Sequence, residues 1–226
     1  MTVHAPLEDL ALINPNTNGR TTRQMTELAR EFWTAGGAAV HGFTANQGPS
    51  MIIDPEALAA AVDPVREAAR EARASIKPAA IIIAAIGDPG RREVEAESDV
   101  PVVGIGEAAI LAAAHRGARF GMATTTDQLV GSLEDLVASY ECGAGFTGVE
   151  LTEDGPLELA ADPEEQYRQL LDAVRRGIDR GAEAMIIAGG PLSETARRLR
   201  SAVPARIVEP IPEACKRVEQ ALRAER

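Results

Sequence analysis

The chain has 226 residues, of which 45% are hydrophobic and 25% charged. This composition is typical of a folded globular protein and excludes extended disorder. The net charge is −11, with 34 acidic against 23 basic residues. It argues against nucleic acid and against a membrane surface as partners, because both are bound mainly through Lys and Arg.

Export and metal signals are absent from the sequence. No apolar run reaches the roughly 18 residues of a membrane span, and the first residues lack a signal-peptide pattern, so we expect a cytoplasmic protein. The two cysteines, Cys142 and Cys215, are far apart, which does not favour a disulfide framework. No His or Cys residues stand at metal-ligand spacing, and we expect neither a metal nor a cofactor.

In the first part of the chain, short apolar runs alternate with helical patterns. Asp63-Pro64 is expected to kink or split the second helix. The helix that begins at 17 has Thr17 or Asn18 available as its cap. Strands are predicted at 10–13, 39–43, 79–86 and 102–103, and helices at 17–33, 55–74 and 107–115.

The pattern then restarts. Strands are predicted at 118–124, 148–151, 184–188 and 207–208, and helices at 127–140, 163–180, 193–200 and 213–223. Such alternation predicts an α/β fold of two pseudo-symmetric halves, each a parallel sheet flanked by helices, with a ligand cleft between them. We assign 1–103 to the first half and 104–207 to the second. The segment 208–226 is expected to be a helix that packs back on the first half.

Four turns follow strands at matching places in the two halves. Asn14-Pro15-Asn16-Thr17 and Thr124-Thr125-Thr126 each precede a helix, where backbone N–H groups and the helix dipole attract anions. Ordinary turn and capping roles are the alternative for both. Ile86-Gly87-Asp88-Pro89 and Ala188-Gly189-Gly190-Pro191 close later strands. Because ligands of open α/β sheets bind at the carboxyl ends of strands, we expect these turns to bind a small carboxylate or cyclic imide.

Two carboxylates stand close to these turns. Asp88 and Glu107 are the candidate catalytic acid and base, although turn formation and a helix N-terminus are alternative roles for them. Gly104-Ile105-Gly106 does not fit the dinucleotide-binding pattern, which argues against that class of site. The candidate substrate-binding residues are Asn14, Asn16, Pro49, Ser50, Ile86, Gly87, Thr124, Thr125 and Gly190.

Taken together, these motifs resemble the aspartate/glutamate racemase superfamily, and most closely its hydantoin racemase branch. The stretches that carry the resemblance are 13–17, 48–50, 86–90, 101–109, 124–125 and 181–183. The resemblance implies two α/β halves around a cleft, and it leads us to expect a homo-oligomer. It also implies two catalytic cysteines, one on each face of the substrate carbon, that remove and return a proton.

Both of these cysteines are missing. Ala85 stands where the resemblance places the first thiol, and Gly189, or Ala188 in the neighbouring register, stands where it places the second. Neither alanine nor glycine can carry a proton, so the two-thiol mechanism is not open to this chain.

Two hypotheses follow for the function. The first is a divergent racemase-like enzyme that acts on a small carboxylate, amino-acid derivative or hydantoin-like ring without cysteines, as an isomerase or as a lyase or ring-opening enzyme. The second is a non-catalytic binding protein for a small anion, or a supporting subunit, on the same scaffold.

Overall fold

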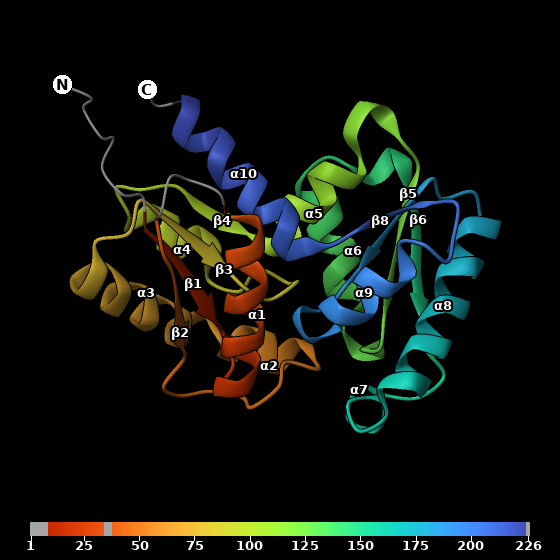
Figure 1. The fold of residues 1–226 in the computed structure, drawn as a ribbon, viewed down its shortest axis with the longest axis horizontal. Helices are drawn as coiled ribbons and strands as arrows, with labels where there is room; N and C mark the ends of the chain where they lie inside the picture. The colour runs from red at the N-terminus through yellow and green to blue at the C-terminus, as the bar shows by residue number, and fades with distance from the viewer. Residues whose placement is uncertain (1–8, 34–37, 225–226) are drawn as a thin grey trace.

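The computed structural model describes residues 9–33 and 38–224. The opening segment, which the sequence predicts to carry no export signal, lies outside the described residues. Two halves lie side by side, each with a four-stranded parallel sheet between layers of helices (Figure 1). The predicted fold class is confirmed.

The first half holds a sheet of order β2-β1-β3-β4. Its strands are β1 (Leu10–Asn14), β2 (Val40–Thr44), β3 (Ala80–Ile83) and β4 (Val102–Gly104). Its helices are α1 (Gly19–Phe32), α2 (Pro55–Ala60), α3 (Val62–Ile76) and α4 (Arg91–Ala96). The central helix α5 (Ile105–Ala113) leads into the second half.

The second half repeats this arrangement, with a sheet of order β6-β5-β7-β8. Its strands are β5 (Phe120–Thr124), β6 (Phe146–Leu151), β7 (Ala184–Ile187) and β8 (Arg206–Val208). Its helices are α6 (Val130–Ser139), α7 (Pro156–Leu159), α8 (Pro163–Asp179) and α9 (Ser193–Leu199). Short 3-10 turns lie at η1 (His115–Gly117), η2 (Asp127–Leu129), η3 (Gly143–Gly145) and η4 (Gly190–Leu192). The last helix, α10 (Pro210–Ala224), returns to the first half (Figure 1).

Alternating side chains place a core on both faces of each sheet, as the period of two along a strand requires. On β3, Ile82 faces the core under α1 and α10, whereas Ile81 and Ile83 face the core under α3. Helix α5 is buried on nearly every side. Its Ala108 packs in the core of the first half and its Ile110 in that of the second, so α5 fastens the two halves together.

Several element boundaries differ from the sequence-based expectation. The apolar run predicted as a strand over 79–86 forms β3 only to Ile83, and the remainder turns away from the sheet. The predicted helix over 55–74 divides at Ala61, two residues before Asp63, so that Pro64 lies in the first turn of α3, where its missing N–H costs nothing. Helix α10 begins at Pro210 rather than at Glu213.

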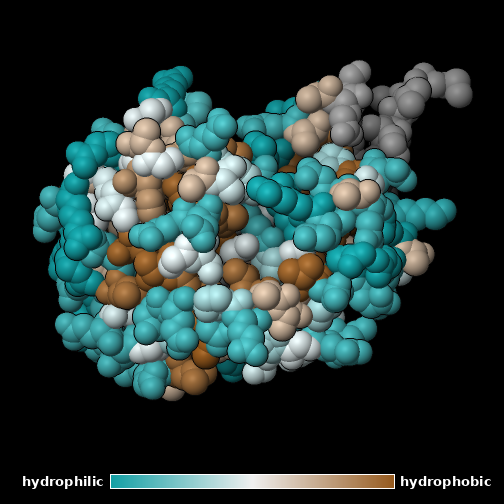
Figure 2. All heavy atoms as spheres, turned by 180° about the vertical axis from the view of Figure 1, so that it is seen from behind, coloured by the Kyte–Doolittle hydropathy of each residue, from teal (hydrophilic) through white to brown (hydrophobic). Residues whose placement is uncertain are grey.

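On the face seen from behind, hydrophilic residues predominate and hydrophobic residues show in smaller patches between them (Figure 2). Among the described residues, Leu157 is the one large hydrophobic side chain with substantial exposure, at 61%. No helix within 9–33 and 38–224 is long and apolar enough to cross a membrane.

Candidate functional site

A cleft opens between the halves, at the carboxyl ends of both parallel sheets. Its empty volume is about 800 Å³ when the open mouth is included. The turn after β3 contributes Ala84 to Gly87, and the turn after β7 contributes Ala188 to Pro191. The sequence repeat therefore places two equivalent turns against one space, as expected at a switch point of an α/β sheet.

Backbone donors line this cleft. The N–H groups of Ala85, Ile86, Gly87 and Thr125 have no hydrogen-bond partner within the described part of the chain. All four residues line the cleft. Buried N–H groups in proteins are almost always paired, so these donors are available to the carbonyl or carboxylate oxygens of a ligand.

The side chains of the asparagine turn, residues 14–17, mainly form hydrogen bonds within the turn and with the start of α1. Asn14 is fully buried, and its side-chain amide donates to Asn16 Oδ1 at 2.9 Å and to Thr22 Oγ1 at 2.9 Å. Asn18 caps α1 by accepting from the backbone of Arg20 and Thr21. Only Asn16 lines the cleft. Its Oδ1 is occupied by Asn14 and by the Asn18 N–H, which leaves its amide NH₂ free to donate to a ligand.

In the threonine turn, residues 124–126, one side chain also has a structural role and the others line the cleft. Thr124 is buried and donates to Ala188 O at 2.9 Å, which ties the ends of β5 and β7 together. It also accepts from the N–H of Thr126 at 3.3 Å. Thr125 and Thr126 line the cleft. The hydroxyl of Thr124 therefore has a structural role, whereas its two neighbours line the ligand space.

Most of the remaining wall is apolar, and the sequence analysis did not foresee it. Gln166 from α8 adds a side-chain amide, held by Thr195 Oγ1, which donates to its Oε1 at 2.7 Å. The large apolar residues of the wall are Met25, Met51, Ile52, Ile53, Leu58, Leu129 and Leu192. In the sequence, the apolar run 51–53, which follows the turn at 48–50, was the one indication of this apolar wall. Pro49 and Ser50 do not line the cleft themselves.

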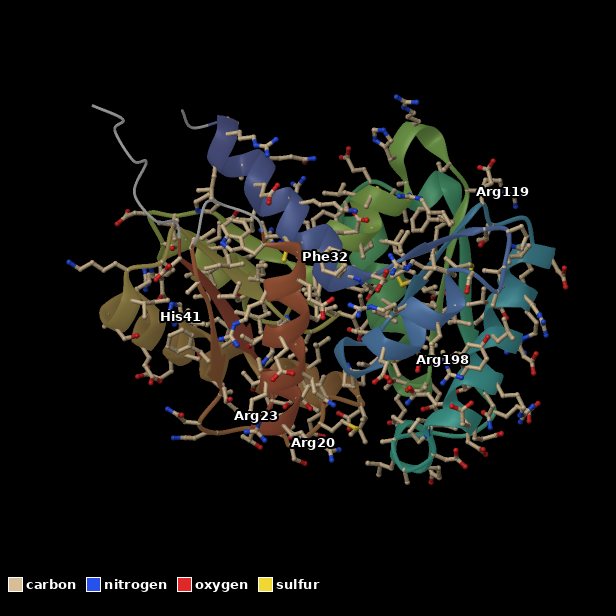
Figure 3. The ribbon with its side chains drawn as sticks, viewed as in Figure 1. Arg20, Arg23, Phe32, His41, Arg119 and Arg198 are labelled. Carbon is tan, nitrogen blue, oxygen red and sulfur yellow. The ribbon has the colours of Figure 1, made fainter. Side chains whose placement is uncertain are left out.

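No titratable side chain lines the cleft among the described residues. In particular, Asp88 and Glu107 stand behind the wall. The four arginines labelled in Figure 3 do not line the cleft. Arg20 and Arg23 lie near the start of α1, Arg119 directly precedes β5, and Arg198 on α9 pairs with Glu164 at 2.9 Å. The walls therefore bind through neutral groups.

Asp88 holds the start of α5. Its backbone adopts a left-handed φ of 49°, and its carboxylate accepts from Gly106 N at 2.8 Å and from Glu107 N at 2.6 Å. Burial raises the pKa of Asp88 to about 7, against the lowering effect of these two donors. A Cβ on Gly104 would lie 2.2 Å from Asp88 Cγ. The Gly-Ile-Gly motif therefore makes room for this carboxylate.

Glu107 takes part in a separate ionic cluster. Arg217 of α10 donates to it at 2.8 Å, and Arg91 of α4 lies 3.5 Å away. Its buried Oε2 has no hydrogen bond. The cluster joins α4, α5 and α10, away from the cleft.

Ala85 and Gly189, where the resemblance leads us to expect thiols, both line the cleft, as does Ala188, the alternative to Gly189. Cys215 is buried in α10 and Cys142 lies beyond α6. Burial raises the pKa of Cys215 to about 12 and also raises that of Cys142. Neither cysteine lines the cleft.

The sequence and the fold are both similar to those of known racemases. The chain is 25% identical to the hydantoin racemase of Paenarthrobacter aurescens over 211 residues, 93% of this chain and 89% of the relative. The fold matches allantoin racemase from Klebsiella pneumoniae with a TM-score of 0.90 at 23% identity, covering 96% and 89% of the two chains. Arylmalonate decarboxylase shares the fold more distantly, with a TM-score of 0.66 at 13% identity and coverage of 94% and 92%.

A family model matches residues 10–218, which span both sheets and every turn that lines the cleft. On that match, the chain belongs to the Asp/Glu/hydantoin racemase family.

Proposed function

We propose that this family member binds a hydantoin-like ring, or a comparable small carbonyl compound, in the cleft and promotes proton exchange at its α-carbon without thiols. The observation that carries the proposal is the set of unpaired backbone N–H groups at Ala85, Ile86, Gly87 and Thr125. They come from both halves, and all four residues line one cleft.

Such donors suit the chemistry of an enolate. Removing a proton next to a carbonyl places negative charge on the carbonyl oxygen, and backbone N–H groups fixed by the fold stabilise that charge. One well-placed donor contributes roughly 10²- to 10³-fold in rate. Because the described walls offer no acid or base, we assign the proton transfer to water or to the substrate itself.

The apolar wall indicates which substituent the ring carries. Met25, Met51 and Leu129 line the cleft together with the run 51–53. Burial of apolar surface contributes roughly 25 cal/mol per Å², whereas a ureido or charged substituent would leave polar groups unpaired there. We therefore expect an aliphatic or aromatic substituent to bind better than a polar one.

A second candidate is a binding protein that retains the cleft without turnover. The observation that favours it is the lack of any titratable side chain among the described residues of the wall. Both candidates share the same ligand chemistry, and only turnover separates them.

Proton NMR in D₂O with 5-benzylhydantoin tests both candidates. Loss of the α-proton signal above the rate without protein supports the enzyme, whereas line broadening without exchange supports the binding protein. Ala85→Leu fills the cleft and should abolish either effect. Ala74→Leu, on the exposed side of α3, adds the same side chain elsewhere and should change neither. Silence across a panel of substituted hydantoins, allantoin and malonates would overturn the proposal.

A further inference from the structure

A second hollow, separate from the cleft, lies between α5 and α10. Its empty volume is about 800 Å³. Its walls carry His115, Arg206, Lys216 and Arg217 but a single carboxylate, Glu213. Arg217 pairs with Glu107 and Lys216 pairs with Glu213, so among the described residues Arg206 is the unpaired guanidinium of this hollow, in a chain whose net charge is −11.

Arg206 is the cation with the most free donors. Its guanidinium donates to Ala112 O at 2.5 Å, and it has no carboxylate partner within the described residues. A guanidinium carries five N–H donors, so most of them remain for a ligand. Lys216 pairs with Glu213 at 2.9 Å, but its side chain is 58% exposed. Exposed pairs of this kind contribute little, so this ammonium can also turn to a ligand.

The groove is also rigidly placed. Helix α5 runs from β4 to the second half, and α10 returns from β8 to the first, so both connections between the halves form its walls (Figure 1). The two helices pack against each other. Ala108 on α5 and Ala214 on α10 are buried in one core, which fixes the backbone that carries the cations.

We propose that this groove binds a phosphate-type dianion, carried by a small phosphomonoester. The planar fork of Arg206 and the ammonium of Lys216 match the oxygens of a phosphate. The volume exceeds that of phosphate alone, and His115 and Gln220 remain to contact the organic part. This site is independent of the function proposed for the cleft.

Isothermal titration calorimetry with inorganic phosphate and with glycerol 3-phosphate tests the proposal. Glycerol 3-phosphate is expected to bind more tightly than phosphate, and equal affinity would assign the site to inorganic phosphate alone and overturn the ester. Arg206→Gln should weaken glycerol 3-phosphate binding about tenfold or more, because a charge-assisted pair is lost. Lys216→Gln, at an exposed position, should weaken it in the same direction without affecting folding.

Arg92→Gln is the matched control, since it removes one positive charge from an exposed site on α4. It should leave binding unchanged. Circular dichroism establishes that each variant is folded. Absence of binding to the wild-type chain at millimolar glycerol 3-phosphate would overturn the proposal, as would equal binding by wild type, Arg206→Gln and Lys216→Gln.

Discussion

Gly106→Ala is expected to destabilise the protein, although helix propensity predicts the opposite. Gly106 lies inside α5, where alanine is favoured over glycine by about 1 kcal/mol. A Cβ there would lie 2.1 Å from the carbonyl oxygen of Ile86, well inside the roughly 3.5 Å of an ordinary contact. Moving the two apart stretches both hydrogen bonds to Asp88. Overpacking costs about 1–3 kcal/mol, and each weakened charged hydrogen bond adds to it.

The net loss should be about 2–4 kcal/mol in the free energy of unfolding. Urea unfolding followed by far-UV circular dichroism measures it. Gly131→Ala, inside α6, is the matched control because no atom lies within 4 Å of its added Cβ. That variant should gain about 0.5–1 kcal/mol. If Gly106→Ala is as stable as Gly131→Ala, the close approach of α5 to the Ile86 turn has no energetic consequence and the reasoning fails.

Further predictions concern protons and thiols. Because burial raises the pKa of Asp88 from an ordinary 3.8 to about 7, the folded chain holds a proton there that the unfolded chain releases. Stability relative to Asp88→Asn should therefore rise by about 1 kcal/mol between pH 8 and pH 6 in urea unfolding; parallel curves for the two proteins would contradict this. Cys215 should not react with a thiol reagent until the chain unfolds, because it is buried and its pKa is raised. Alkylation of Cys142 should leave hydantoin binding intact, because Cys142 does not line the cleft. Ala85→Cys combined with Gly189→Cys should accelerate α-proton exchange, and iodoacetamide should remove the gain over the wild-type rate. A gain that survives the reagent would count against these positions.

The sequence predicts the fold well because hydrophobic periodicity reports burial, and most buried runs are strands. Because apolar runs report burial, the strand predicted over 79–86 was extended wrongly across 84–86. These residues are apolar because they line a cleft, not because they belong to β3. The short helix α4 escaped prediction, since its six residues are mostly charged and follow a Gly-Asp-Pro-Gly turn.

The candidate site is less accessible to sequence reasoning. Asn16 and Thr125 line the cleft, whereas Asn14 and Thr124 in the same turns point inward. Residue type does not reveal which way a turn side chain points. Gln166 and Met25 reach the cleft from long helices, where only the packing of the two halves decides which side chains meet.

The neutral walls of the cleft have a consequence for how it responds to its surroundings. Between about pH 5 and pH 9 the described wall residues neither gain nor lose a proton. A change of ligand affinity across that range would then report either the ionisation of the ligand or the titration of Asp88, which lies behind the wall and directly follows Gly87. The same walls offer nothing to peroxide except the thioethers of Met25 and Met51. Occupancy of this cleft should thus follow ligand concentration and ligand ionisation, and it should not change with the thiol redox state of the medium.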